Sequence, residues 1–423
     1  MPTTTDTFGN PIDPVAGFAR GTIIKSATEE GLRLKNGQRI AAQRVAQSGP
    51  ESISIFSGNQ RDFPIRAQDI HTHCEEWVGP GIFAEELHRA ALAHLGGDPA
   101  NQVAVFNRTS AGIIASIIAL SDSSPVVSIS PRRGRSHASV VHGARLAGAE
   151  LVSVQIDDAW EEAIAKHSPA LVIVTTVTSG LERMNDSDIA GAVARAHENG
   201  AIVLLDEAYG ARLRPVLYDG KLSLDLGADL SVTNCDKAGL SGPRAGLLMG
   251  RGDFVAKVAA TGASFGMEAR APIAAGALRS LQNFQPELLR QEAREGQELA
   301  AALSEQYPAD VVHTSDLGPM VLEDDILADI LRRASLDSTK IVPAEATSAL
   351  GTLLLRDYGI LTVNTHGQPG ARVSLRLKPT TGAIARAGGV TAVAEAVAAS
   401  SQKLADIITD HNQVAELIVG EQA

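Results

Sequence analysis

The sequence of 423 residues has little cysteine and few aromatic residues: two cysteines, Cys74 and Cys235, and 4% Phe, Trp and Tyr. Two cysteines cannot build a disulfide framework, and the N-terminus lacks the charged and then apolar layout of a secretory signal. These absences predict a cytoplasmic protein. The longest apolar runs, such as ALVIVTTV at 170–177, are far shorter than the roughly 20 residues of a membrane-spanning helix, so we expect no membrane segment.

The shortage of aromatic residues also weighs against a nucleic-acid partner, because unpaired bases stack on aromatic rings. The formal net charge of −12 points the same way. An acidic protein can carry a local basic patch, so this composition disfavours tRNA binding without forbidding it. With 44% apolar and 20% charged residues, the chain has the ordinary composition of a globular protein with a sizeable core.

Apolar runs alternate with helical segments through the middle of the chain. The strand-like runs are 103–107, 125–130, 149–154, 170–177 and 201–205. This alternation predicts an α/β fold built from βαβ units, with a mostly parallel sheet covered by helices on both faces. Only a few residues separate two further runs, 229–233 and 245–250, which is too short for a parallel crossover. We therefore expect the last strand to be antiparallel.

The chain changes character near Pro286. Before it, strands and helices alternate; after it come a helix, short strands near 310–322 and a long alanine-rich helix. We expect an N-terminal arm and helical segment at 1–70, a large α/β domain at 71–286 and a small α+β domain at 287–423.

Two charged residues follow strand-like runs: Asp206 comes after AIVLL and Lys237 after DLSVTN. In an open α/β sheet, residues just past the carboxyl end of a strand face the ligand. A lysine and a carboxylate there suit pyridoxal 5′-phosphate (PLP), which needs an amine for a Schiff base and an anion for its pyridine nitrogen. Taken alone, Asp206 is as well explained as a cap and Lys237 as a surface lysine.

A candidate phosphate site precedes this pair. The segment RTSAGIIASIIAL follows the strand at 103–107, and its helix begins with Thr109, Ser110, Ala111 and Gly112. Small residues at a helix start leave N–H groups open to a ligand, and the helix dipole favours an anion there. An ordinary N-cap explains a serine or threonine at this place equally well.

Two other clusters have competing interpretations. The stretch HTHC contains the potential zinc ligands His71, His73 and Cys74, but no second pair at zinc-like spacing follows, so we predict no metal site.

The stretch PRRGRSH sets Arg132, Arg133 and Arg135 before His137. If this loop faces the ligand crevice, it would recognise an anionic or phosphorylated substrate; a solvated basic loop is the alternative.

Five passages carry a family resemblance: FNRTSAG (106–112), DEAYGAR (206–212), TNCDKAGLSGPRAGLLMG (233–250), FGMEARAPIAAGALRSLQNF (265–284) and DYGILTVNTHGQPGARVSLRL (357–377). With them, the chain from about 75 to 380 resembles fold type I PLP enzymes, within them the selenocysteine synthase group, and in particular the archaeal selenocysteine-synthase-like PLP proteins. The resemblance implies a mostly parallel seven-stranded sheet between helices, a smaller α+β C-terminal domain, and a homodimer or higher homo-oligomer.

The resemblance also implies roles for matching positions. Lys237 would form the Schiff base and Asp206 would pair with the pyridinium, while Ala208 and His137 would cover the two ring faces. The remaining cofactor-binding positions are Thr109, Ser110, Ala111, Gly112, Thr233 and Asp236.

Three arginines are candidates for substrate binding. Arg376 would clamp the carboxylate of an amino acid substrate, with Arg372 and Arg108 as further candidates. The implied reaction is loss or exchange of a β-substituent, by a lyase or a sulfur/selenium-type transferase acting on a serine-, phosphoserine- or cysteine-like amino acid. Transamination is the alternative, and a PLP-binding protein without turnover is a third hypothesis.

Overall fold

The computed structural model describes residues 5–60, 62–363 and 373–421. The chain divides into two compact units. Residues 59–290 form one, which we call the sheet unit, and residues 1–58 together with 291–423 form the other, which we call the terminal unit. Helix α10 (Pro286–Ser304) contains the second boundary between them. Each unit is described by itself.

The sheet unit is built on seven strands. They are β2 (Gln102–Phe106), β3 (Val126–Ser130), β4 (Leu151–Gln155), β5 (Leu171–Thr175), β6 (Ile202–Asp206), β7 (Leu230–Asn234) and β8 (Gly246–Gly250), in the spatial order β2-β8-β7-β6-β5-β3-β4. Strand β8 runs antiparallel to both of its neighbours, β2 and β7. The predicted α/β fold with a mostly parallel seven-stranded sheet is confirmed, and so is the antiparallel direction of the last strand.

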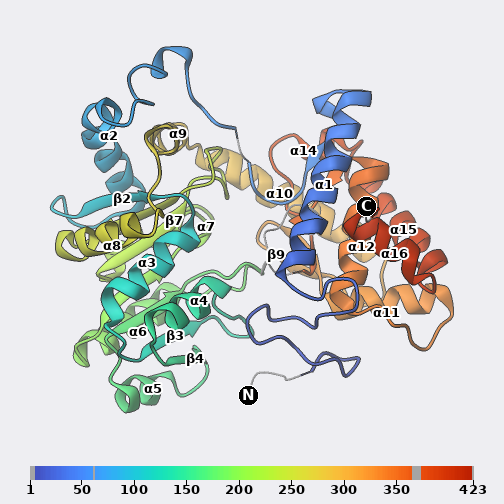
Figure 1. Ribbon diagram of the computed structural model, residues 1–423, viewed down its shortest axis with the longest axis horizontal. Coiled ribbons are helices and arrows are strands. Elements are labelled where there is room, and N and C mark those ends of the chain that lie inside the picture. The colour runs from blue at the N-terminus through green and yellow to red at the C-terminus, as the bar shows by residue number, and fades with distance from the viewer. Residues whose placement is uncertain (1–4, 61, 364–372, 422–423) are drawn as a thin grey trace. The chain divides into compact units, whose positions relative to one another are not determined.

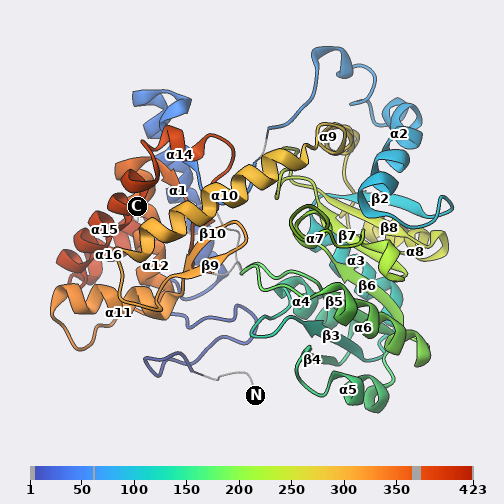
Figure 2. The same cartoon turned by 180° about the vertical axis from the view of Figure 1, so that it is seen from behind.

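Helices cover both faces of this sheet. They are α2 (Val78–Leu95), α3 (Thr109–Ser121), α4 (Ala138–Ala147), α5 (Trp160–His167), α6 (Asp186–Glu198), α7 (Gly210–Tyr218), α8 (Gly252–Ser264) and α9 (Ala271–Gln282). Successive strand residues point to opposite faces. Leu204 accordingly packs in the cluster that contains α3, α4 and α8, whereas Val203 and Leu205 pack with α5 and α6. Figure 1 looks onto the side of α3, and Figure 2 onto the side of α6.

The direction of the strands fixes where a ligand can bind. Strands β2, β3, β5, β6 and β7 all point the same way, because β2 and β7 are each antiparallel to β8 and the others pair in parallel. Their carboxyl ends therefore meet at one edge of the sheet, where open α/β sheets bind ligands.

The terminal unit is an α+β structure. Its helices are α1 (Ala27–Ser48), α11 (Glu323–Ala334), α12 (Pro343–Tyr358), α14 (Ala383–Arg386), α15 (Val390–Ile407) and α16 (His411–Val419). Strand β1 (Ser54–Ile55) pairs with β11 (Ile360–Leu361), and β12 (Leu375–Arg376), β10 (Gly318–Val321) and β9 (His313–Ser315) form an antiparallel sheet.

The N-terminal segment belongs to this unit. The N–H groups of Ile23 and Ile24 donate to the buried carboxylate of Glu345, at 2.6 and 2.8 Å. None of the helices in the described parts of the chain has both the length and the apolar character that crossing a membrane requires.

Candidate active site

Asp206 is the last residue of β6 and lies at the ligand-binding edge of the sheet, with 4% of its surface exposed. Its Oδ1 is buried and has no hydrogen-bond partner among the described residues. Burial raises the pKa of this carboxyl to about 6, although the Ala208 N–H and the charge of Lys237 act against the rise. A buried carboxylate oxygen without a partner needs a donor, and a bound ligand can supply one.

Lys237 lies three residues beyond β7 and is half-buried. Its Nζ is 5.0 Å from the ring centroid of Tyr209, which follows Ala208 in the chain. The next two residues, Ala238 and Gly239, have positive φ angles of 50° and 81°. Such a conformation is costly for alanine, and strain of this kind is found where a side chain must be held in one direction.

The start of α3 lies at the same edge. Arg108 is its N-cap residue, with an extended backbone, and its carbonyl accepts from the N–H groups of Ala111 and Gly112. A Cβ on Gly246 of β8 would come within 2.6 Å of the Arg108 carbonyl oxygen and 2.7 Å of the Thr109 nitrogen. The missing side chain in β8 thus lets the helix start approach the sheet closely. Thr109 and Ser110 are half-buried there, in the arrangement that favours an anion.

His137 is the N-cap residue of α4. Its Nδ1 accepts from the N–H of Ser139 at 3.1 Å, and the ring remains accessible to solvent. Surrounding protein, followed by the charges of Lys237, Arg108 and Arg135, lowers the pKa of His137 to about 4. The ring is therefore uncharged near neutral pH. The structure thus brings two other predicted residues, Arg108 and Lys237, within electrostatic reach of His137.

Thr233 and Asp236 are both buried. The Thr233 hydroxyl donates to the Glu207 carbonyl and accepts from Arg212, each at 2.8 Å. The hydroxyl proton is therefore already used in a hydrogen bond within the protein. The Asp236 carbonyl accepts from the N–H of Gln60 at 3.0 Å.

Sequence reasoning missed Arg212 and Asn234, whose side chains both reach the Ala208 carbonyl. Arg212 was visible only as the last letter of the DEAYGAR passage, and Asn234 only as the end of a strand-like run.

Arg132, Arg133 and Arg135, which lie in the loop before His137, have different contacts. Arg132 pairs with Asp157 at 3.1 Å, and the main-chain N–H of Arg133 donates to Gln155. Arg135 is the one of the three whose charge acts on His137.

The remaining candidates belong to other segments of the chain. Arg376 is a buried residue of β12 in the terminal unit, and Arg372 lies outside the described residues. His73 is 3.5 Å from Asp69, which is held by Arg279. Within the described ranges, no three side chains of the metal-binding types gather at one place.

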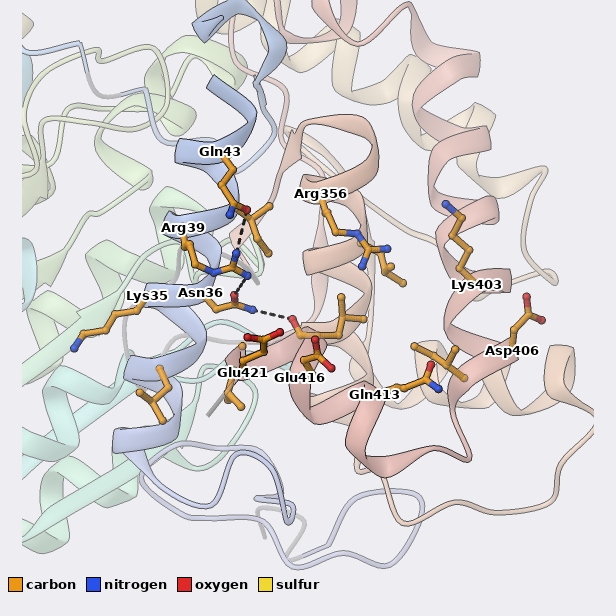
Figure 3. A pocket seen from close by; sticks show the side chains of 17 residues that line it. Lys35, Asn36, Arg39, Gln43, Arg356, Lys403, Asp406, Gln413, Glu416 and Glu421 are labelled. Atoms are coloured by element: carbon orange, nitrogen blue, oxygen red, sulfur yellow. Dashed lines mark hydrogen bonds between the residues drawn. The ribbon is translucent and has the colours of Figure 1, made fainter. Parts of the chain in front are cut away.

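The terminal unit contains a cavity of about 980 Å³ between α1, α12, α15 and α16. Figure 3 shows Arg39 on one wall, Arg356 and Lys403 on the other, and Glu416 and Glu421 below. Arg39 donates to Asn36 and Gln43, while Arg356 and Lys403 donate to Asp357. Arg39, Arg356 and Lys403 thus have partners within the protein itself.

Comparison with known proteins decides the family. The model of the family described as aminotransferase class I and II matches residues 78–381. The chain belongs to this family. It is 31% identical over 401 residues to a UPF0425 pyridoxal phosphate-dependent protein of Methanothermobacter thermautotrophicus, covering 94% of this chain and 100% of that one. A protein of the same name from Methanosphaera stadtmanae is 30% identical over 354 residues, covering 82% and 88%.

Solved structures agree on the fold. An alanine–glyoxylate aminotransferase from Nostoc sp. has a TM-score of 0.57 at 14% identity, covering 82% of this chain and 95% of that one. A probable N-succinyldiaminopimelate aminotransferase from Thermus thermophilus has a TM-score of 0.55 at 15% identity, covering 88% and 100%. The predicted fold type I architecture is confirmed, and the cofactor is PLP.

The residues at the sheet edge fit this cofactor. The Asp206 oxygen that lacks a partner in the described ranges suits a protonated ring nitrogen, Lys237 supplies an amine, and the start of α3 suits a phosphate. The narrower assignment to the selenocysteine synthase group is part of the proposal below.

Proposed function

We propose that this PLP-dependent enzyme is a lyase or a sulfur/selenium-type transferase that removes or exchanges the β-substituent of an amino acid. The observation that carries the cofactor chemistry is the buried oxygen of Asp206, which has no partner among the described residues and lies on the strand next to the one that leads to Lys237. When bound, PLP serves as the electron sink for negative charge that develops at Cα. The resemblance to the selenocysteine synthase group supports the loss or exchange at Cβ.

The protein's own residues divide the work. Lys237 would hold the cofactor through a Schiff base; once the amino group of the substrate has displaced it, the freed lysine amine would take the proton from Cα as a general base. Asp206 keeps the ring nitrogen protonated, because an ionised carboxylate at this buried position is stabilised by a cationic partner. His137, which is uncharged at neutral pH, covers one face of the cofactor ring, and Ala208 covers the other. The phosphate is received by the start of α3, at Thr109, Ser110, Ala111 and Gly112. Asp236 and Thr233 support the segment that carries Lys237.

The charge near His137 favours an anionic substituent on the substrate. Arg108 and Arg135 both act on this ring, as does Lys237 in the cofactor-free protein. Cations placed where negative charge develops lower the barrier for departure of an anion. A phosphorylated or acidic amino acid is therefore the substrate class that we favour.

Transamination is the second candidate, because the family is described as aminotransferase class I and II. It shares the first proton transfer but retains the side chain of the substrate.

The products distinguish these reactions. Purified protein supplied with PLP is incubated with serine, phosphoserine, cysteine and aspartate, with Lys237→Ala as the control. Steady release of pyruvate and ammonia from the first three supports β-elimination. One equivalent of keto acid, with the cofactor left in its amino form, supports transamination. Bound PLP with neither product overturns the proposed reaction and leaves a binding protein without turnover.

A pair of arginine variants tests the substrate class. Arg135→Gln should raise KM for phosphoserine about tenfold or more and leave KM for serine within about twofold. Arg132→Gln, which removes the pair with Asp157, is the control and should change neither value. Equal KM values for both variants and the wild type would remove Arg135 from substrate binding.

Arg376 and Arg372 stay predictions as substrate-carboxylate residues, and the homodimer stays a prediction as well. Arg376→Lys should raise KM for every accepted amino acid, since lysine cannot reproduce a bidentate contact. Light scattering of the purified protein measures the oligomer directly.

A further inference from the structure

Arg212 in α7 has no exposed surface. Burial lowers its pKa to about 10, although the charges of neighbouring groups such as Glu207 act to raise it. Moving a guanidinium out of water costs several kcal/mol, so it is tolerated when its N–H groups find acceptors. Arg212 lies two residues after Gly210, at the beginning of the helix that follows Asp206 and Ala208.

The guanidinium reaches acceptors from two strands. Nη2 donates to the Ala208 carbonyl and to Asn234 Oδ1, both at 2.8 Å, and Nη1 donates to Thr233 Oγ1 at 2.8 Å. Nη1 also lies 3.3 Å from His94 Nε2. Ala208 follows β6, whereas Thr233 and Asn234 end β7. The Arg212 side chain thus joins the carboxyl end of β6, which carries Asp206, to the carboxyl end of β7, which leads to Lys237.

Side chains replace main-chain pairing at this place. The paired register of β6 and β7 ends at Asp206 and Val232, and the last main-chain bond runs from Glu207 N to Val232 O at 2.9 Å. Beyond it, the Thr233 hydroxyl donates to the Glu207 carbonyl and Asn234 Nδ2 donates to the Ala208 carbonyl at 2.5 Å. Arg212 binds both of these β7 side chains. It therefore completes a set of side-chain hydrogen bonds that joins the two strands beyond their last main-chain hydrogen bond.

We propose that Arg212 is a positioning residue that fixes the turn after β6 against the turn after β7, and so sets the placement of Asp206, Ala208 and Lys237 toward the cofactor. The inference rests on the proposed use of these residues to hold PLP. Ala208 is the direct link on one side, because its N–H donates to the Asp206 carboxylate while its carbonyl accepts from Arg212. Asn234, three residues before Lys237, is the link on the other.

A matched control is available in the same unit. Arg279 in α9 has a side chain that is 13% exposed and donates to the buried carboxylate of Asp69 at 2.6 Å. That ion pair ties α9 to the segment before α2. Arg279→Lys and Arg212→Lys are the same substitution, and both weaken a buried guanidinium contact of the sheet unit.

The first measurement needs no cofactor. Amide hydrogen exchange of cofactor-free protein should be about tenfold faster in peptides covering 234–240 for Arg212→Lys than for the wild type, since lysine cannot bridge two strand exits. Arg279→Lys should leave exchange in these peptides unchanged. Asn234→Ala, a milder change, should accelerate exchange about threefold.

The second measurement is PLP binding, followed by the absorbance of lysine-bound cofactor. Arg212→Lys should raise the Kd for PLP about tenfold, and adding Asn234→Ala to it should raise the Kd little further, because both side chains share the Ala208 carbonyl. Arg279→Lys should lower Tm without changing the Kd.

Equal exchange and equal Kd in Arg212→Lys and Arg279→Lys would overturn the inference and leave Arg212 with a purely structural role. If Arg212→Lys does not fold, Asn234→Ala decides: wild-type exchange in 234–240 together with a wild-type Kd overturns it. Failure of the wild type to bind PLP would instead overturn the proposed function, and the exchange comparison would still test the cross-link.

Discussion

Two polar regions of this protein have opposite electrostatics. In the cavity of the terminal unit, hydrogen bonds to Asp357 raise the pKa of Arg356 and of Lys403, so the protein favours their charged forms. At the carboxyl edge of the sheet, burial raises the pKa of Asp206 to about 6, and the surrounding protein together with the charges of Lys237, Arg108 and Arg135 lowers that of the solvent-accessible His137. There the protein disfavours the charged forms.

The difference shows that cavity size alone does not identify the active site. The cavity measures about 980 Å³, yet its cations Arg356 and Lys403 already have a partner in Asp357. The Asp206 carboxyl retains a buried oxygen without a partner in the described residues. Perturbed pKa values of this kind cluster at functional sites, because ligands and substrates complete them.

The largest expected effect comes from Lys237→Ala. Removing the amine should lower kcat by about a thousandfold or more, because the variant loses both the covalent attachment and the base. Product formation from the best substrate of the screen measures this. Retention of more than about a tenth of the wild-type rate would contradict the assignment of Lys237 as the base.

Asp206→Asn should lower kcat about a hundredfold and change the pH dependence of stability in cofactor-free protein. The folded-state pKa of about 6 lies above the usual 3.8, so the contribution of Asp206 to stability is present below pH 4 and is lost as pH rises to 6. The asparagine variant lacks this loss and should be more stable than the wild type by about 3 kcal/mol at pH 7. Urea unfolding at pH 4 and pH 7 tests this; equal differences at both values would refute it.

His137 variants should have a smaller effect, confined to cofactor affinity. His137→Phe retains a flat ring and should keep the Kd for PLP within about threefold, whereas His137→Ala should raise it about tenfold. The low pKa of His137 also means that its contribution to stability is lost as pH falls from 6.5 to 4, and His137→Phe should lack that acid-side loss. Identical affinities for the phenylalanine and alanine variants would argue against ring stacking.

Lys403→Ala in the cavity should have the smallest effect. It removes an exposed ion pair with Asp357, which solvent and salt screen, so we expect little loss of stability. PLP affinity, kcat and KM should all equal those of the wild type. A change in any of them beyond about twofold would show that the cavity takes part in function, and would break the contrast between the two regions.

The sheet and its reactive pair were predictable because they depend on order along the chain. Buried strands give continuous apolar runs, and Asp206 and Lys237 each follow one directly. The antiparallel direction of β8 followed from the short connection after Lys237.

What depends on three-dimensional contact was not predictable. In sequence, Arg212 looks like any helix-surface arginine, and its burial follows only from the position of Asn234 and Ala208 around it. The three arginines of the 132–135 loop look equivalent in sequence, yet in the structure Arg132 pairs with Asp157 and Arg135 acts on His137.

We propose above all that Lys237 holds PLP at the carboxyl edge of the sheet, where β6 ends at Asp206. Borohydride reduction of the protein in the presence of PLP, followed by peptide mass spectrometry, tests it most directly. We expect one reduced pyridoxyl group per chain, on the peptide that contains Lys237, and none in Lys237→Ala. Modification of another lysine in the wild type, or no modification at all, would contradict it.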